Sequence, residues 1–307
     1  MVSLKEVKTR IQSVNSTRQI TSAMKMVSSA KLHKAQKVVD EFILYQSKLN
    51  QILTNFLEYE EREEVQETFI PFSEHREIKR VAIVVFSSNN SLCGAFNSHI
   101  IRLLEKTIEE YSYLGTENIL VVPIGKKVSD YAKRLPNVYD KSLDGFVAKP
   151  TYAEVASLAD TLSQQFLREE LDRVEFIYQH FKTASTQALT HEIFLPFNIE
   201  RTIQSIEDFF PEGHDTPSFD YQVNYILEPN RQELIDALIP KAIRLKLYAI
   251  LLDSIAAEHS ARIVAMQIAT ENADVLLQSL KIQYNKSRQQ VITNELLDII
   301  GGSISIQ

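Results

Sequence analysis

Two long segments, one near each end of the chain, repeat apolar or small residues at alternating steps of four and three. The second covers residues 241–300, which contain no proline or glycine, and Gly301 and Gly302 follow it. Its repeating positions are Ile243, Leu247, Ile250, Ser254, Ala257, Ala261, Val264 and Ile268. This spacing keeps one stripe on one side of a helix, as a coiled-coil seam requires. It predicts a helix about 90 Å long, too long to be buried in one ordinary globular domain.

The first segment, residues 3–58, carries the same pattern and also lacks proline and glycine. Its stripe is interrupted between Arg18 and Ser28, where the repeating positions become polar. Drift of the stripe around the helix is one explanation, because an α-helix does not match a seven-residue repeat. The second explanation is that this stretch faces another protein. The matching lengths of the two segments predict that they pair with each other.

The period changes between these segments. Residues 80–86 and 119–124 are runs typical of buried parallel strands. Three helices are predicted, one that ends at about Tyr111, a short one that ends at Leu135, and one over 152–167. The sequence also predicts an antiparallel strand pair at 174–181 and 188–197 and an edge strand at 219–227. We therefore predict an α/β fold with a long coiled coil, in which a Rossmann-like domain is inserted between two helices. The predicted boundaries are 1–60, 75–228 and 230–307.

Composition narrows the class of protein. The chain of 307 residues is 44% hydrophobic and 24% charged, which is ordinary for a soluble protein. Its single cysteine, Cys93, excludes a disulfide framework and a multi-cysteine metal site. No apolar run is long enough to cross a membrane, and the start of the chain lacks the apolar core of a signal peptide. We expect a cytoplasmic protein or a peripheral part of something membrane-bound.

The first forty residues are basic in a chain whose formal net charge is −7. They hold Lys5, Lys8, Arg10, Arg18, Lys25, Lys31, Lys34 and Lys37 against Glu6 and Asp40. A basic helix is compatible with binding to nucleic acid or to an anionic surface. A solvated or internally paired helix face is the more common reason for such a pattern.

Candidate catalytic residues are few. The turn 87–94 follows the first predicted strand, where a doubly wound fold binds phosphate, but it lacks both glycine-rich phosphate-loop patterns. Cys93 with His99 is a weak candidate nucleophile pair, since most cysteines are small buried hydrophobes. His180 and His191 have no clustered metal ligands, and Glu258-His259 is half of a zinc motif. We predict no catalytic, cofactor or metal site.

Both helices carry motifs that resemble those of a known family. The first holds Ile20-Thr21-Ser22-Ala23-Met24-Lys25-Met26-Val27, and the second holds Ser260-Ala261-Arg262-Ile263-Val264-Ala265-Met266 and Tyr284-Asn285-Lys286-Ser287-Arg288-Gln289. With Leu92-Cys93-Gly94 and Asn97 between them, these resemble the gamma subunit of rotary F-type ATP synthases. The family usually has an Asp-Arg/Lys-Gly triplet where this chain has Asn89-Asn90-Ser91, and Ala where it has Ser303.

The resemblance implies a fold and a function. The two helices would form an antiparallel left-handed coiled coil, a shaft inside a ring of alpha and beta subunits. The α/β domain would lie below that ring with the epsilon subunit, against the membrane-embedded c-ring. Turning of the c-ring and shaft would drive the catalytic sites of the beta subunits, while this chain performs no bond chemistry. It would be peripheral, at the cytoplasmic face of a bacterial plasma membrane, and would touch the membrane only through the complex.

The resemblance also implies contact residues. Those expected to meet the ring are Met24, Lys25, Arg262, Arg288, Gln289, Thr293 and Glu295, and those expected at the c-ring are Tyr225 and Glu228. Ring contacts must be remade at every step of rotation, so we expect them to be polar and partly hydrated. Two other classes remain open, a nucleotide-cofactor-binding α/β enzyme and a coiled-coil scaffold or nucleic-acid binder.

Overall fold

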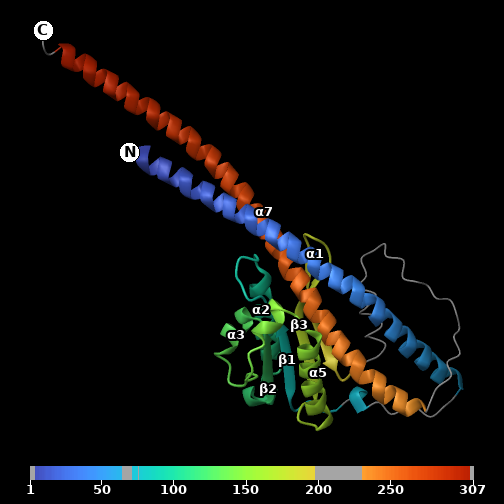
Figure 1. Cartoon of the computed structure of the whole chain (residues 1–307). Helices are drawn as coiled ribbons and strands as arrows, with labels where there is room; N and C mark the ends of the chain where they lie inside the picture. Colours follow the sequence, from blue (N-terminus) through green and yellow to red (C-terminus); the bar gives the residue numbers. More distant parts are fainter. Residues whose placement is uncertain (1–3, 64–70, 75, 198–229, 305–307) are drawn as a thin grey trace. The chain divides into compact units, whose positions relative to one another are not determined.

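The computed structural model describes residues 4–63, 71–74, 76–197 and 230–304. Its contacts divide the chain into two compact units. One, here the helical unit, contains residues 4–29 and 262–304, and the other, the mixed unit, contains the described residues between 30 and 261. Helix α1 (Leu4–Glu63) and helix α7 (Arg231–Ile304) each contribute to both units (Figure 1). No helix in the described segments is long and apolar enough to cross a membrane.

The mixed unit is built on a sheet of four strands in the order β2-β1-β3-β4. The strands are β1 (Val81–Phe86), β2 (Ile119–Ile124), β3 (Arg173–Phe181) and β4 (Gln187–Leu195). β1 pairs parallel to both β2 and β3, with Val81 opposite Ile119 and Arg173, and β3 pairs antiparallel to β4. This confirms the predicted mixture of parallel strands and one antiparallel pair.

Helices cover both faces of the sheet. They are α2 (Phe96–Glu110), α3 (Lys126–Ala132), α4 (Asp144–Ala148) and α5 (Tyr152–Leu167), with short 3₁₀ turns at Pro71–Ser73, Ser112–Leu114 and Thr116–Asn118. Alternate residues of β1 point to opposite faces, so Ile83 packs with α2 and Val84 packs with α5 and α7. Every residue of β1 is buried, which explains why its sequence shows no polar alternation.

Helix α7 is longer than its sequence pattern predicts at both ends. It begins at Arg231 and continues through Pro240, because Ile235, Ile239 and Ile243 are buried in the core on either side of the proline. The burial of such side chains, about 1.5–3 kcal/mol each, offsets the hydrogen bond that proline removes. The predicted end at Gly301 is also wrong, since the helix runs on to Ile304. Glycine costs a helix only about 1 kcal/mol.

The remaining elements lie close to their predicted positions. Helix α5 matches the predicted span 152–167, and the four strands match within two residues at each end. Helix α1 extends to Glu63, five residues past the predicted end, through a glutamate-rich stretch that favours helix. The short helix α4 was not predicted. The predicted edge strand at 219–227 lies outside the described residues.

Candidate functional site

The helical unit pairs α1 with α7 in antiparallel directions. Arg18 Nη1 lies 3.1 Å from Asp274 Oδ1, and the hydroxyls of Thr21 and Thr270 are 2.8 Å apart. The Lys25 ammonium donates to the Gln267 side-chain oxygen. Residue numbers rise along α1 as they fall along α7, so the two helices run in opposite directions.

These pairs explain the polar break in the first stripe. Thr21 and Ser28 are buried, and Lys25 is half-buried, so this polar stretch faces α7. The apolar side chains of Ile20 and Val27 are instead 59% and 57% exposed. The polar residues therefore pair within the chain, and Ile20 and Val27 stay on the exposed side of the helix. Met24 is half-buried.

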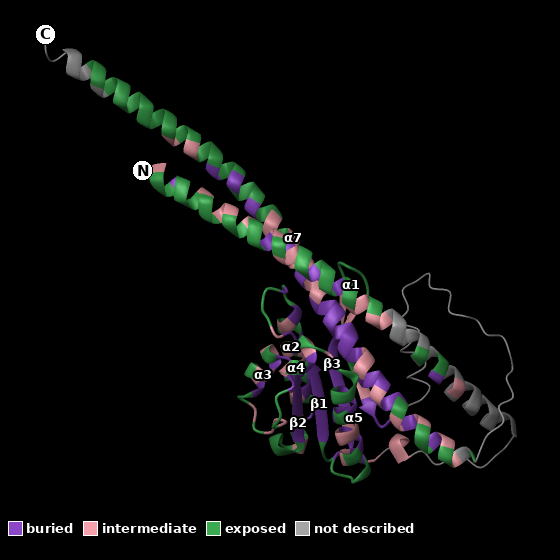
Figure 2. Cartoon of the chain, in the orientation of Figure 1, coloured by how far each residue is buried: buried purple, intermediate pink, exposed green. Residues whose placement is uncertain are grey.

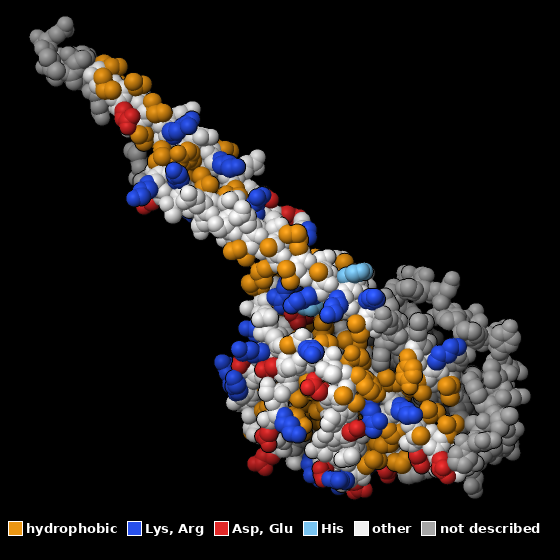
Figure 3. Space-filling model, viewed as in Figure 1, with side chains coloured by type: hydrophobic (Ala, Val, Ile, Leu, Met, Phe, Trp, Pro, Cys, Tyr) orange, Lys and Arg blue, Asp and Glu red, His pale blue; other side chains and the backbone are white. Residues whose placement is uncertain are grey.

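Beyond these pairs, α7 continues without α1 (Figure 1). The antiparallel register places Leu4, the first residue of α1, beside about residue 288, and α7 ends at Ile304. Six large apolar side chains in this stretch are between 44% and 69% exposed: Val291, Ile292, Leu296, Leu297, Ile299 and Ile300. Figure 3 shows hydrophobic side chains in orange along this part of the helix. We call residues 289–304 the free end of α7.

Four of the five predicted contact residues of the second helix lie at or beside the free end. Arg288, Gln289, Thr293 and Glu295 are all exposed, and the Thr293 hydroxyl donates to the Gln289 carbonyl at 2.8 Å. They share the segment with the six apolar side chains, so its surface is mixed. Arg262 is only 7% exposed. Tyr225 and Glu228 lie outside the described residues, and their roles remain predictions.

The turn after β1 is closed by its own hydrogen bonds. The Asn97 amide donates to Cys93 Sγ at 3.1 Å and its oxygen accepts from the Ser88 N–H at 3.1 Å. The Asn89 amide donates to the Asp144 carbonyl at 2.8 Å, and its oxygen accepts from the Lys126 N–H at 2.9 Å. Asn89, which departs from the resembled triplet, therefore joins this turn to the first residues of α3 and α4. Cys93 is buried, whereas reactive cysteines are partly exposed to solvent.

The sheet edge where a doubly wound fold binds ligands is filled. At the carboxyl end of β2, Gly125 lies so close to Ser87 that a Cβ atom would be 2.2 Å from the Ser87 carbonyl oxygen. The Gln179 amide donates to the Phe96 carbonyl at 2.9 Å, and Ala257 of α7 packs in the same cluster. Backbone and side chains thus occupy the space at the carboxyl ends of β1 and β3 that a nucleotide would need.

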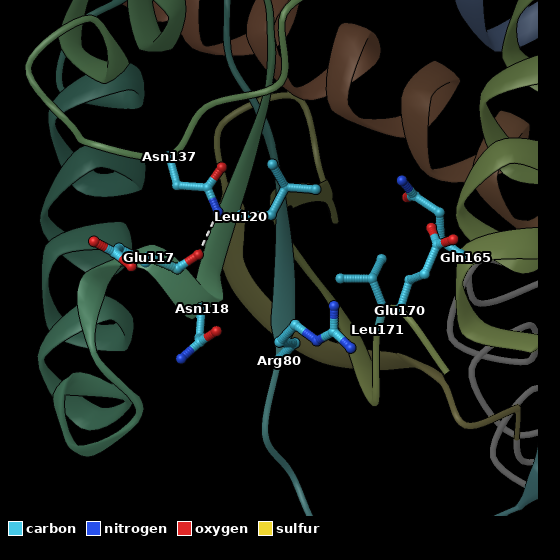
Figure 4. Close-up of a pocket in the computed structure, with 8 residues that line it drawn as sticks. All are labelled: Arg80, Glu117, Asn118, Leu120, Asn137, Gln165, Glu170 and Leu171. Carbon is cyan, nitrogen blue, oxygen red and sulfur yellow. Dashed lines mark hydrogen bonds between the residues drawn. The ribbon is translucent and has the colours of Figure 1, made fainter. Parts of the chain in front are cut away.

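A shallow hollow of about 310 Å³ lies at the opposite edge (Figure 4). It is lined by Arg80, Glu117, Asn118, Leu120, Asn137, Gln165, Glu170 and Leu171. Asn137 Nδ2 donates to the Glu117 carbonyl at 2.8 Å, and Arg80 Nη2 donates to the Glu169 carbonyl at 3.2 Å. These bonds of Asn137 and Arg80 are made within the chain, and the hollow adjoins the amino ends of β1 and β2, away from the edge where a doubly wound fold binds ligands.

The two strand histidines each pair with one carboxylate. His180 Nδ1 lies 2.9 Å from Asp253 Oδ2, and His191 Nε2 lies 2.7 Å from Glu175 Oε2. The described residues contain no group of three His, Cys, Asp or Glu side chains able to hold a metal ion. The sequence alone indicated neither partner: Asp253 is 73 residues from His180, and Glu175 is 16 residues from His191 on the neighbouring strand.

Glu175 is the centre of a buried polar network. The Tyr111 hydroxyl donates to Glu175 Oε1 at 2.6 Å, and Arg173 Nη1 donates to the Tyr111 oxygen at 3.0 Å. Burial favours the neutral acid, but the hydrogen bonds from His191 and Tyr111 outweigh it and lower the pKa of Glu175. The bond to Glu175 raises the pKa of His191, and burial raises the pKa of Tyr111 to about 12.

We expect His191→Gln to reduce the free energy of unfolding most between about pH 4.5 and 6.5, by about 1–3 kcal/mol. The lowered pKa of Glu175 stabilises the folded chain at pH values above 4.5, the ordinary pKa of the group. This stabilisation is lost as the pH falls through the pKa that Glu175 has in the folded chain. The raised pKa of His191 stabilises the folded chain at pH values below 6.5, the ordinary pKa of the group. This stabilisation is lost as the pH rises through the pKa that His191 has in the folded chain. Urea unfolding across pH measures the difference. His99→Gln, the same change on an exposed histidine, is the control, and a pH-independent loss for His191→Gln would contradict the prediction.

Comparisons with known proteins match the chain along its whole length. The family model described as ATP synthase matches residues 3–306. The ATP synthase gamma chain of Phocaeicola vulgatus is 50% identical over 305 residues, 99% of this chain and 100% of the relative. That of Bacteroides thetaiotaomicron is 50% identical over 304 residues, with the same coverage. The chain belongs to the ATP synthase gamma chain family.

Solved structures of the family share the fold. A chain from the Euglena gracilis mitochondrial ATP synthase (OSCP/F1/c-ring, rotational state 3) aligns with a TM-score of 0.62 at 17% identity, covering 99% of this chain and 94% of that one. A chain from the Tetrahymena thermophila mitochondrial ATP synthase, described as central stalk/c-ring, aligns with a TM-score of 0.52 at 20% identity. The alignment covers 81% of this chain and 99% of that one. The family resemblance in the motifs is thus confirmed, and the two long helices with an α/β domain are the fold of this family.

Proposed function

We propose that the chain is the rotating central-stalk subunit of its host's F-type ATP synthase. It couples ion flow through the c-ring to ATP synthesis or hydrolysis on the beta subunits and performs no bond chemistry itself. The observation that carries this proposal, beyond family membership, is the free end of α7. A helix that leaves its partner and exposes six large apolar side chains requires a surrounding protein surface. Figure 2 draws this end largely as exposed.

The proposed partners follow from the exposed residues. The free end faces the ring of alpha and beta subunits and contributes Arg288, Gln289, Thr293 and Glu295 to the contact. The part of α1 around Met24 and Lys25 faces the beta subunits. Arg262, whose side chain is buried in the chain by itself, belongs to the proposed contact with the ring as a position tied to coupling. Tyr225 and Glu228 meet the c-ring, and the epsilon subunit binds the mixed unit. The complex holds this chain at the cytoplasmic face of the membrane.

The filled edge of the sheet supports a non-catalytic role. A phosphate needs backbone N–H groups that point into open space, whereas those of Ser88 and Lys126 are bound to Asn97 and Asn89. The same observation weighs against a nucleotide-cofactor enzyme built on the mixed unit. The basic residues Arg18 and Lys25 are paired within the chain, which weighs against nucleic-acid binding through this stretch of α1.

Reconstitution of the host's ATP synthase in liposomes, with and without this chain, tests the proposal. The complete complex should acidify the vesicles when ATP is added, and the complex lacking the chain should not. The purified chain alone should neither hydrolyse ATP nor bind it tightly. ATP-driven acidification without the chain, or ATP hydrolysis by the chain alone, would overturn the proposal.

A further inference from the structure

Helix α7 carries a row of buried polar residues within an apolar stretch. Lys246, Asp253 and Ser260 follow one another at intervals of seven residues, which is close to two helical turns, so they lie on one side of the helix. Their exposed fractions are 7%, 5% and 0%. The neighbouring positions Leu245, Leu247, Ile250, Leu251, Leu252, Ala256 and Ala257 are buried and apolar. We call these three residues the polar row.

The first two members of the polar row bond to β3 and β4. Lys246 Nζ lies 3.6 Å from Glu192 Oε2 on β4. Asp253 Oδ1 accepts from the Phe181 N–H at 3.0 Å, and Asp253 Oδ2 lies 2.9 Å from His180 Nδ1. Both partners of Asp253 belong to the last residues of β3, so this carboxylate fastens α7 to the end of a central strand.

The third member bonds to the turn between β3 and β4. The Ser260 hydroxyl donates to the Ala184 carbonyl at 2.7 Å. Gln187 Nε2 in turn donates to Ser260 Oγ at 3.0 Å. The whole polar row is therefore bonded to one hairpin, residues 173–195, at points about 10 Å apart along the helix axis.

Apolar packing alone would bury this side of α7 equally well. Replacing buried ionic groups by hydrophobic residues is often neutral or stabilising, so the polar row is not explained by stability. Hydrogen bonds differ from apolar contacts in being directional, because they weaken steeply when the donor or acceptor turns away. Two such hydrogen-bonded attachments, at Asp253 and Ser260, together with the ion pair of Lys246, oppose both rotation of α7 about its own axis and sliding along the hairpin.

We infer that the polar row is the joint through which the sheet of the mixed unit and α7 transmit torque to each other. This inference rests on the proposed rotor function. A rotor driven from one part and loaded at another needs an attachment that does not turn under load. The hairpin supplies it, since β3 is a central strand paired on both sides, to β1 and to β4.

Substitution of Asp253 in the reconstituted complex tests the joint. Asp253→Leu keeps the branching at Cγ, with two larger methyl groups in place of the two oxygens, and cannot accept a hydrogen bond. Asp253→Asn is the matched control, because its oxygen can accept from the Phe181 N–H and its amide can donate to neutral His180. Two quantities are measured, amide hydrogen exchange at Phe181 and the largest pH gradient reached during ATP hydrolysis.

We expect Asp253→Leu to speed exchange at Phe181 by about tenfold or more, as befits loss of a buried hydrogen bond. It should also lower the pH gradient at an unchanged rate of ATP hydrolysis, since the joint yields under load. Asp253→Asn should resemble the unsubstituted complex both in amide exchange at Phe181 and in the pH gradient. A normal pH gradient in an Asp253→Leu complex with fast exchange at Phe181 would overturn the inference.

Ser260→Ala provides a second test should Asp253→Leu fail to assemble. It removes one oxygen atom and releases the Ala184 carbonyl and the Gln187 amide, so a smaller loss of pH gradient is expected. An unchanged gradient would overturn the inference. Failure of the rotor proposal is recognised separately, because the unsubstituted complex would then acidify vesicles without this chain.

Discussion

A disulfide between a cysteine at Ser287 and one on a facing beta subunit is expected to abolish multi-site ATP turnover. Ser287 is half-buried and lies just before the free end of α7. If the chain must rotate, a covalent bond to one beta subunit stops it from reaching the other two. Oxidation should stop turnover and reduction should restore it, with both measured on the same assembled complex. Cys93 is buried and is the single cysteine of the sequence, so it does not compete for the crosslink.

An internal disulfide across the helical unit is the matched control. The Thr21 and Thr270 hydroxyl oxygens are 2.8 Å apart, so cysteines at both positions place their sulfur atoms within bonding reach. This bond joins α1 to α7 and leaves the rotor free to turn as one body. Turnover should therefore survive its oxidation. Full turnover with the Ser287 crosslink verifiably closed would mean that rotation of this chain is not required.

The periodic elements could be predicted from the sequence because their signals are local. The three-four stripes predicted α1 and α7, and continuous β-branched runs predicted β1 and β2, since both faces of those strands are covered. The course of α7 through Pro240 could not be predicted in this way. It depends on core contacts of Ile235 and Ile239 that no local pattern contains.

The sequence predicted the candidate site only in the segments that hold recognisable motifs. The motif around Arg288 marked the free end of α7, but the meaning of the polar break in α1 required the partner helix. Lys25 is half-buried because Gln267, 242 residues away, accepts its hydrogen bond. The polar row was missed, although its seven-residue spacing within an apolar stretch was visible. These residues lie beside the apolar stripe that runs through Ser254 and Ala257, and their partners on β3, β4 and the turn between them are distant in the sequence.

Gly125→Ala is expected to lower the free energy of unfolding by about 3 kcal/mol or more. Gly125 has φ of +97°, a conformation that residues with a Cβ rarely adopt. The added carbon would also lie 2.2 Å from the Ser87 carbonyl oxygen and 2.8 Å from its carbon, both backbone atoms that cannot turn aside. Relief requires β1 and β2 to separate where the Ser87 N–H donates to the Ile124 carbonyl at 2.8 Å. Urea unfolding of the purified chain measures the loss.

Two other glycines separate backbone strain from the clash. Gly115 has φ of +82° but open space around its Cα, so Gly115→Ala carries the strain without the contact, and about 1–3 kcal/mol is expected. Gly145 has neither a positive φ nor a neighbour within 4 Å, and Gly145→Ala, in helix α4, should be neutral or slightly stabilising. The loss should therefore fall in the order Gly125, Gly115, Gly145. Equal losses at Gly125 and Gly115 would show that the loops after β1 and β2 can separate at little cost, and that this edge of the sheet can open to a ligand.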